Sequence, residues 1–192
     1  MKKVLILACA VIAAVSCSSK KEAKLLPAEN FVDTIGGTPV ALYTLKAGDI
    51  VLQVTNFGGR VASIFTPDLK GNMADIVVGR NNIKDYAESH GERFLGACVG
   101  PVANRIGKAQ FYVNDILYKV PANDNKVNTL HGGFKGLDMV AWDVKEVTPT
   151  SVTLTYLHKD GQEGFPGNLS IEMKYSVNDD NEFRIDYKAT TD

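Results

Sequence analysis

Three stretches in the second half of the chain alternate apolar and polar residues, and this pattern constrains the fold most. Residues 152–158, 171–177 and 183–189 place most of their apolar side chains at every second position. Successive side chains of a β-strand point to opposite faces, so a period of two predicts strands with one buried and one solvated face. A helix repeats every 3.6 residues instead, which argues against helices here.

Other short apolar runs are separated by turn-forming residues. One short helix is predicted at residues 82–89, capped by Asn81 or Asn82. Many short antiparallel strands joined by Gly-, Asn- and Asp-containing turns predict an all-β fold, a sandwich or a barrel. The further strands are predicted at residues 40–45, 50–55, 60–66, 75–79, 111–113 and 116–120.

The amino end is typical of a targeting segment. Two lysines precede an apolar run at residues 4–15, which is shorter than the roughly 20 residues a membrane-spanning helix needs. Small residues lie directly before Cys17, as at a bacterial lipoprotein cleavage site, although an ordinary secretory signal with a chance cysteine is the alternative. We expect residues 1–16 to be a lipoprotein signal peptide, Cys17 to carry the lipid and residues 17–28 to form a tether. The domain at residues 29–192 would then be exported and lipid-anchored to a bacterial membrane, in the periplasm or at the cell surface.

Charge and cysteine content limit the partners and the stabilising bonds. Removal of residues 1–16 leaves 19 basic and 22 acidic residues, a net charge of −3. This balance gives no basic surface for nucleic acid. Cys9 leaves with the signal and Cys17 is assigned to the lipid, so Cys98 has no partner for an internal disulfide.

Three segments interrupt the alternation and are dense in Gly, Asn, Arg and His: residues 94–106, 129–142 and 158–169. In the first, Asn104 and Arg105 together offer an amide and a planar fork of donors suited to vicinal sugar hydroxyls. A structural arginine bonded to carbonyls or to a carboxylate is the alternative. In the second, two glycines follow His131, so that a ligand can approach the backbone closely. His131 could hold a sugar oxygen or simply bond within its loop.

The third segment favours a rigid surface loop, because Asp-Gly and Pro-Gly are turn pairs. A sugar-facing role for Glu163 is a minor possibility. Phe165 and Trp142 could stack on a pyranose, but aromatic residues in a sandwich are more often core. The sequence contains no G-x-S-x-G or P-loop pattern, and His90, His131 and His158 are too widely spaced for a local zinc motif, so no metal is expected.

Taken together, these segments resemble the amino-terminal part of the aldose 1-epimerase (galactose mutarotase) family. The resemblance rests on ANRI, LHGG with a following G-x-D and W, and DGQEGFPGNL, in that order, and covers about residues 29–192. It implies a large antiparallel β-sandwich, the galactose-mutarotase-like supersandwich, that binds a free aldohexose such as galactose or glucose and interconverts its α and β anomers without a cofactor. Asn104 and Arg105 match the substrate-binding pair, and His131 matches an auxiliary histidine that contacts the sugar.

The resemblance also implies a main acid histidine in an N-H-x-[YF]-F-like segment and a glutamate base, and neither is found before Asp192. We therefore expect a truncated sandwich with little or no epimerase activity. Three explanations stay open: a fragment of a full epimerase, a non-catalytic sugar-binding lipoprotein, and a non-functional remnant with an exposed sheet edge.

Overall fold

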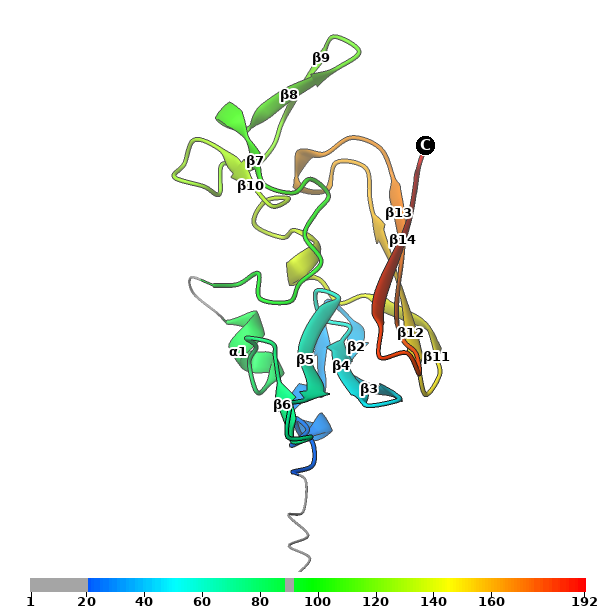
Figure 1. Cartoon of the computed structure of the whole chain (residues 1–192). Coiled ribbons are helices and arrows are strands. Elements are labelled where there is room, and N and C mark those ends of the chain that lie inside the picture. Colours follow the sequence, from blue (N-terminus) through cyan, green and yellow to red (C-terminus); the bar gives the residue numbers. More distant parts are fainter. Residues whose placement is uncertain (1–20, 89–91) are drawn as a thin grey trace, which may run out of the picture.

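A computed structural model describes residues 21–88 and 92–192, and the two largest sheets in it are four-stranded and antiparallel (Figure 1). The first sheet is ordered β3 (Leu42–Ala47), β4 (Ile50–Thr55), β5 (Arg60–Pro67) and β6 (Met73–Asp75). The second is ordered β11 (Asp143–Val147), β12 (Ser151–His158), β13 (Leu169–Val177) and β14 (Phe183–Thr191). The predicted all-β, antiparallel fold is confirmed.

The two sheets share one hydrophobic core. β3 contacts both β12 and β13, and β4 contacts β13. Leu45 and Leu52 from the first sheet and Leu154 and Met173 from the second are fully buried in the same cluster, together with Trp142 from the segment that leads into β11. Burial of such side chains contributes about 1.5–3 kcal/mol each, so this interface is the main source of stability.

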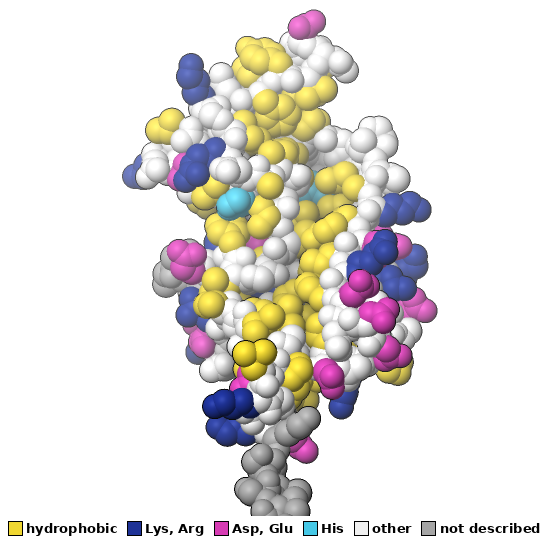
Figure 2. Space-filling model, viewed as in Figure 1, with side chains coloured by type: hydrophobic (Ala, Val, Ile, Leu, Met, Phe, Trp, Pro, Cys, Tyr) yellow, Lys and Arg dark blue, Asp and Glu magenta, His cyan; other side chains and the backbone are white. Residues whose placement is uncertain are grey.

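The alternation seen in the sequence matches burial well in β13 and less well in β14. In β13 the apolar positions are buried and Lys174 is exposed. In β14, which lies at the edge of its sheet, Tyr187 remains 59% exposed although it lies on the apolar face. An edge strand has a neighbour on one side only, so its apolar face is incompletely covered. Figure 2 shows charged side chains of both signs over this side of the molecule.

The two sheets are also joined by their hairpin turns. Gly48, in the turn between β3 and β4, donates its N–H to the carboxylate of Asp179 at 3.1 Å. The N–H of Asp49 donates to Asn181 Oδ1 at 2.7 Å. Asp179 and Asn181 lie in the turn between β13 and β14, so polar turn residues fix one end of the sandwich.

The short helix is confirmed, and one strand is shifted. α1 (Ile83–Ala87) begins after Asn82, whose side chain accepts the N–H of Asp85 at 2.8 Å. The strand expected at residues 75–79 is found instead at β6, because Asp75 Oδ1 accepts the N–H groups of Ile64 and Val77, each at 3.0 Å, and ends the regular ladder.

The remaining elements are short. They are β1 (Asp33–Ile35), β2 (Thr38–Val40), β7 (Arg105–Ile106), β8 (Gln110–Val113), β9 (Ile116–Lys119), β10 (Thr129–Leu130), and the 3₁₀ turns η1 (Ala28–Phe31), η2 (Gly107–Ala109), η3 (Leu137–Met139) and η4 (Gln162–Gly164). β1 pairs with β2, β7 with β10, and β8 with β9.

The segment expected to be a tether lies partly outside the described residues, as do the predicted signal peptide and Cys17. Its described part contacts the first sheet: Met73 donates its N–H to the carbonyl of Lys21 at 2.9 Å, and Leu26 donates to Gln53 Oε1 at 2.8 Å. Within residues 21–88 and 92–192, no helix is both long and apolar enough to cross a membrane.

Candidate sugar-binding site

The strand pair β7–β10 brings the three predicted site residues together. Arg105 in β7 lies opposite Leu130 in β10, which places Asn104 beside His131. The N–H of His131 donates to the carbonyl of Asn104 at 3.0 Å. The N–H of Asn104 donates in return to Nδ1 of His131 at 2.9 Å. Two sequence segments separated by more than 20 residues thus form one polar cluster.

This geometry fixes the tautomer of the neutral imidazole. Because Nδ1 of His131 accepts a hydrogen bond from the Asn104 N–H, the ring proton of the neutral form lies on Nε2. Nε2 is then a hydrogen-bond donor for a ligand oxygen. The ring of Phe94 packs edge-on against the imidazole, with 4.5 Å between ring centroids, and restricts its orientation.

Arg105 is held by an aspartate that was not among the predicted site residues. Its Nε donates to Asp124 Oδ2 at 2.8 Å, and the Arg105 side chain remains 54% exposed. Hydrogen bonds from Arg105 and then from Asn128 lower the pKa of Asp124, so its carboxylate stays ionised. Nη1 of Arg105 lies 3.4 Å from Asn104 Oδ1. The remaining guanidinium donors have no protein partner among the described residues, in a side chain that is half-exposed, so they are available to bind a ligand.

The two positions after His131 require glycine because other protein atoms lie too close to their Cα atoms for a side chain to fit. Gly132 has φ +87°, and a Cβ there would lie 1.8 Å from the carbonyl oxygen of Gly100. Gly133 has φ +102°, and its Cβ would lie 2.4 Å from a carboxylate oxygen of Glu163. The glycines allow the predicted sharp turn, but the atoms that approach their Cα atoms closely belong to Gly100 and Glu163 and not to a ligand.

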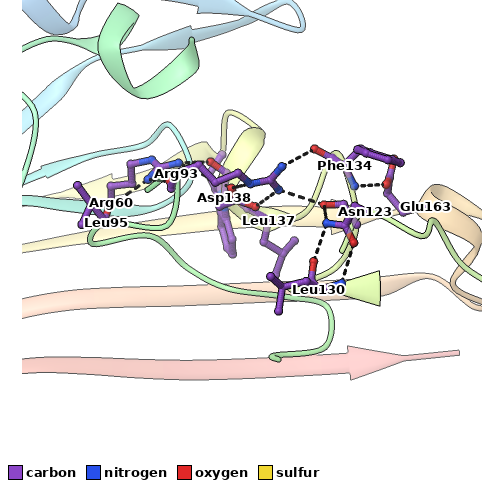
Figure 3. A network of polar contacts seen from close by, with 11 residues as sticks. Arg60, Arg93, Leu95, Asn123, Leu130, Phe134, Leu137, Asp138 and Glu163 are labelled. Atoms are coloured by element: carbon purple, nitrogen blue, oxygen red, sulfur yellow. Dashed lines mark hydrogen bonds and ion pairs between the residues drawn. The ribbon is translucent and has the colours of Figure 1, made fainter. Parts of the chain in front are cut away.

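Three side chains, those of Arg93, Asn123 and Glu163, brace the backbone of the loop that follows His131 (Figure 3). Arg93 donates to the carbonyls of Gly133 and Phe134, both at 3.1 Å. Asn123 Nδ2 donates to the carbonyls of Leu130 and Gly133, both at 2.9 Å. Glu163 Oε2 accepts the N–H of Phe134 at 2.7 Å. Glu163 therefore acts on the loop, and the structural interpretation of its segment is favoured over a sugar-facing one.

Asp138 anchors the brace in the protein interior. Its side chain is fully buried and forms an ion pair with Arg93, with 2.8 Å between Nε and Oδ2. Fully buried Arg60 lies 3.9 Å from the same carboxylate and donates to the backbone carbonyls of Arg93, Leu95 and Asp138. Burial raises the pKa of Asp138, and the two arginines oppose this rise. Burial lowers the pKa of Arg60 to about 10, so the guanidinium stays charged at neutral pH.

Both aromatic residues considered for stacking belong to the interior. Trp142 is fully buried, and its Nε1 donates to the carbonyl of Leu137 at 3.1 Å. Phe165 is 6% exposed and packs with Ala109 and Val120. The core interpretation of these two aromatics is confirmed.

No described part of the chain brings three or more His, Cys, Asp or Glu side chains together in a way that could hold a metal ion. Cys98 is buried, and burial raises the pKa of its thiol to about 11. A thiol with so high a pKa is a poor nucleophile at neutral pH.

Comparison with known proteins identifies the family. Residues 41–192 match the family model of aldose 1-epimerase. The chain is 36% identical over 143 residues to a probable aldose 1-epimerase of Arthroderma benhamiae, a match that covers 73% of this chain and 32% of that protein. It is 32% identical over 154 residues to galactose mutarotase of Rattus norvegicus, a match that covers 80% of this chain and 44% of that protein. A solved aldose epimerase homologue from C. elegans superposes with a TM-score of 0.75 at 28% identity, covering 80% of this chain and 46% of the homologue. The chain thus spans less than half the length of these relatives. It belongs to the aldose 1-epimerase family.

Proposed function

We propose that Asn104, Arg105 and His131 bind a free aldohexose such as galactose or glucose. The observation that carries this proposal is the reciprocal hydrogen bonding between Asn104 and His131, which makes Nε2 of His131 a donor, while the guanidinium of Arg105 contacts the same Asn104. Sugar hydroxyls both donate and accept hydrogen bonds. A fixed imidazole donor beside a planar cationic fork complements a ring oxygen and neighbouring hydroxyls.

The reaction to which this site contributes is the interconversion of α and β anomers. A base removes the proton of the anomeric hydroxyl while an acid protonates the ring oxygen. The ring then opens, the aldehyde end rotates, and the ring closes on its other face. Both groups must lie within hydrogen-bond reach of their oxygens. In this scheme His131 donates from Nε2 to the ring oxygen and supports the developing charge as an auxiliary group.

We further propose that the 192-residue chain alone accelerates mutarotation little or not at all. The main acid histidine and the glutamate base expected from the family resemblance are not among its motifs. Polarimetry on freshly dissolved α-glucose should therefore show the same rate of change in optical rotation with the chain as with buffer. A clear acceleration by the chain would contradict this proposal.

A non-catalytic sugar-binding lipoprotein is the second candidate, favoured by the intact polar cluster. Titration calorimetry with galactose and glucose tests binding without requiring turnover, and galactitol, which has no ring, is the matched control ligand. Heat of binding with an aldose, absent with galactitol, supports a site that recognises the ring. Absence of heat with every aldose would reject both the site and this second candidate.

The proposed location is the surface of a bacterial membrane, through a lipid on Cys17. The short apolar run at residues 4–15 and the small residues before Cys17 support this proposal. We expect the chain to incorporate labelled palmitate when it is expressed in a bacterial host. The Cys17→Ser variant should incorporate none. Equal incorporation by the two chains, or none, would reject lipid attachment at this residue.

A further inference from the structure

A tightly closed loop presents a fully exposed leucine at one end of the molecule. Leu69 lies between β5 and β6 and is the most exposed of the large hydrophobic side chains described. The loop is closed by Asp68, whose carboxylate accepts the N–H groups of Lys70 and Asn72, both at 2.8 Å. Hydrogen bonds from Asn72 lower the pKa of Asp68. The exposed leucine therefore lies in a loop that is closed by hydrogen bonds between Asp68, Lys70 and Asn72.

The same loop lies where the amino-terminal segment meets the domain. The N–H of Lys21 donates to Asn72 Oδ1 at 3.2 Å, and the carbonyl of Lys21 accepts the N–H of Met73 at 2.9 Å. Cys17 precedes Lys21 by four residues. A chain extends at most about 3.6 Å per residue, so four residues can span no more than about 14 Å. A lipid on Cys17 would bring the membrane surface to the loop.

The chemistry around the loop suits a bilayer surface. Leu69 is followed by exposed Lys70, and both Lys21 and half-exposed Leu25 lie on the same side of the first sheet. An apolar tip enters the headgroup region, while lysines extend their ammonium groups to lipid phosphates. Figure 2 shows hydrophobic side chains together with basic and acidic ones at this lower end of the molecule.

We propose that the loop at residues 68–72 is a second membrane contact, inserting Leu69 into the headgroup region of the bilayer that holds the Cys17 lipid. A second contact would strengthen the attachment that the Cys17 lipid provides and would fix the orientation of the domain. In Figure 1, β7 and β10 lie toward the end of the molecule opposite to β6. Contact at the loop would hold the sugar site away from the membrane and open to solution. This inference rests on lipid attachment at Cys17.

The test separates the loop contact from lipidation in the cell. The full chain, carrying Cys9→Ser so that Cys17 is its accessible thiol, is coupled to a maleimide phospholipid in phosphatidylcholine–phosphatidylglycerol vesicles. Leu69→Trp reports on the loop. Tyr112→Trp is the matched control, because Tyr112 is an exposed large side chain in β8 at the far end of the molecule. The unsubstituted tethered chain provides the emission of the native tryptophan for subtraction.

Tryptophan at position 69 should shift its emission to the blue on tethering and be quenched by brominated acyl chains, whereas tryptophan at position 112 should do neither. Equal behaviour of the two positions would overturn the loop contact, whatever happens to Cys17 in cells. Loop quenching without palmitate labelling in cells would instead remove the proposed anchor, and with it the second-contact role.

Discussion

The substitution Asp138→Asn tests how the buried ion network supports the site. It removes the carboxylate that lies 2.8 Å from Arg93 and 3.9 Å from Arg60 while keeping the side-chain shape. Removing one partner of a buried ion pair costs about 3–5 kcal/mol. Arg60 keeps three backbone carbonyls as acceptors, which places the expected cost near the lower limit, about 3 kcal/mol. That is a large part of the 5–15 kcal/mol by which domains are ordinarily stable.

Urea unfolding, followed by the fluorescence of buried Trp142, measures this cost. Asp186→Asn is the matched control, because Asp186 forms an exposed ion pair with Arg184, and such pairs contribute about 0–1 kcal/mol. Asp138→Asn should also weaken sugar binding, since Arg93 would lose the carboxylate that orients it beneath the carbonyl of Gly133. Equal stabilities of the two variants at pH 7 would refute the reasoning, and would indicate that burial keeps Asp138 protonated and neutral.

Two further changes address the loop and a buried histidine. Gly132→Ala should destabilise the fold by about 3 kcal/mol or more, because the new Cβ would meet the carbonyl of Gly100. Gly161→Ala is the control: Gly161 has φ +75° but nothing within 4 Å, so this change should cost about 1 kcal/mol. Equal losses of stability in thermal unfolding of the two variants would contradict the close approach at Gly132. His158 is 1% exposed, its Nε2 has no hydrogen-bond partner among the described residues, and burial lowers its pKa from the ordinary 6.5. Below about pH 6.5, His158 binds a proton in the unfolded chain but not in the folded chain. The free energy of unfolding should therefore decrease as the pH falls below this value. His158→Phe should reduce this loss of stability at low pH and should raise the free energy of unfolding at pH 7 by about 1 kcal/mol. If the stability of the variant between pH 5 and 8 runs parallel to that of the parent, the role given to His158 is wrong.

Most strands could be predicted because alternation depends on local geometry. The pattern in β13 reports directly on its buried face. The same pattern in β14 did not reveal that Tyr187 is exposed, because alternation carries no information on whether a strand lies at a sheet edge. β7 and β10 have two residues each, too few to show any period.

The sequence analysis identified the three residues of the proposed sugar-binding cluster, but it missed the residues that hold them in place. Asn104, Arg105 and His131 stood out through their motifs, and the structure brings them together. Asp124 lies among asparagines in the segment before β10, a cluster that could have been noticed, but its pairing with Arg105 depends on the fold. The contact between Arg93 and Asp138 spans 45 residues and is visible only in the folded chain.

Binding of an aldose by the cluster of Asn104, Arg105 and His131 is the central claim, and a titration of four chains with galactose tests it most directly. The chains are the parent, Arg105→Met, His131→Gln and Arg184→Met, the last removing an exposed, ion-paired arginine remote from the cluster. Loss of a charged or fixed donor should raise the Kd about tenfold or more in Arg105→Met and His131→Gln, with no change in Arg184→Met. The same Kd in all four chains, or no binding by the parent, would contradict the account.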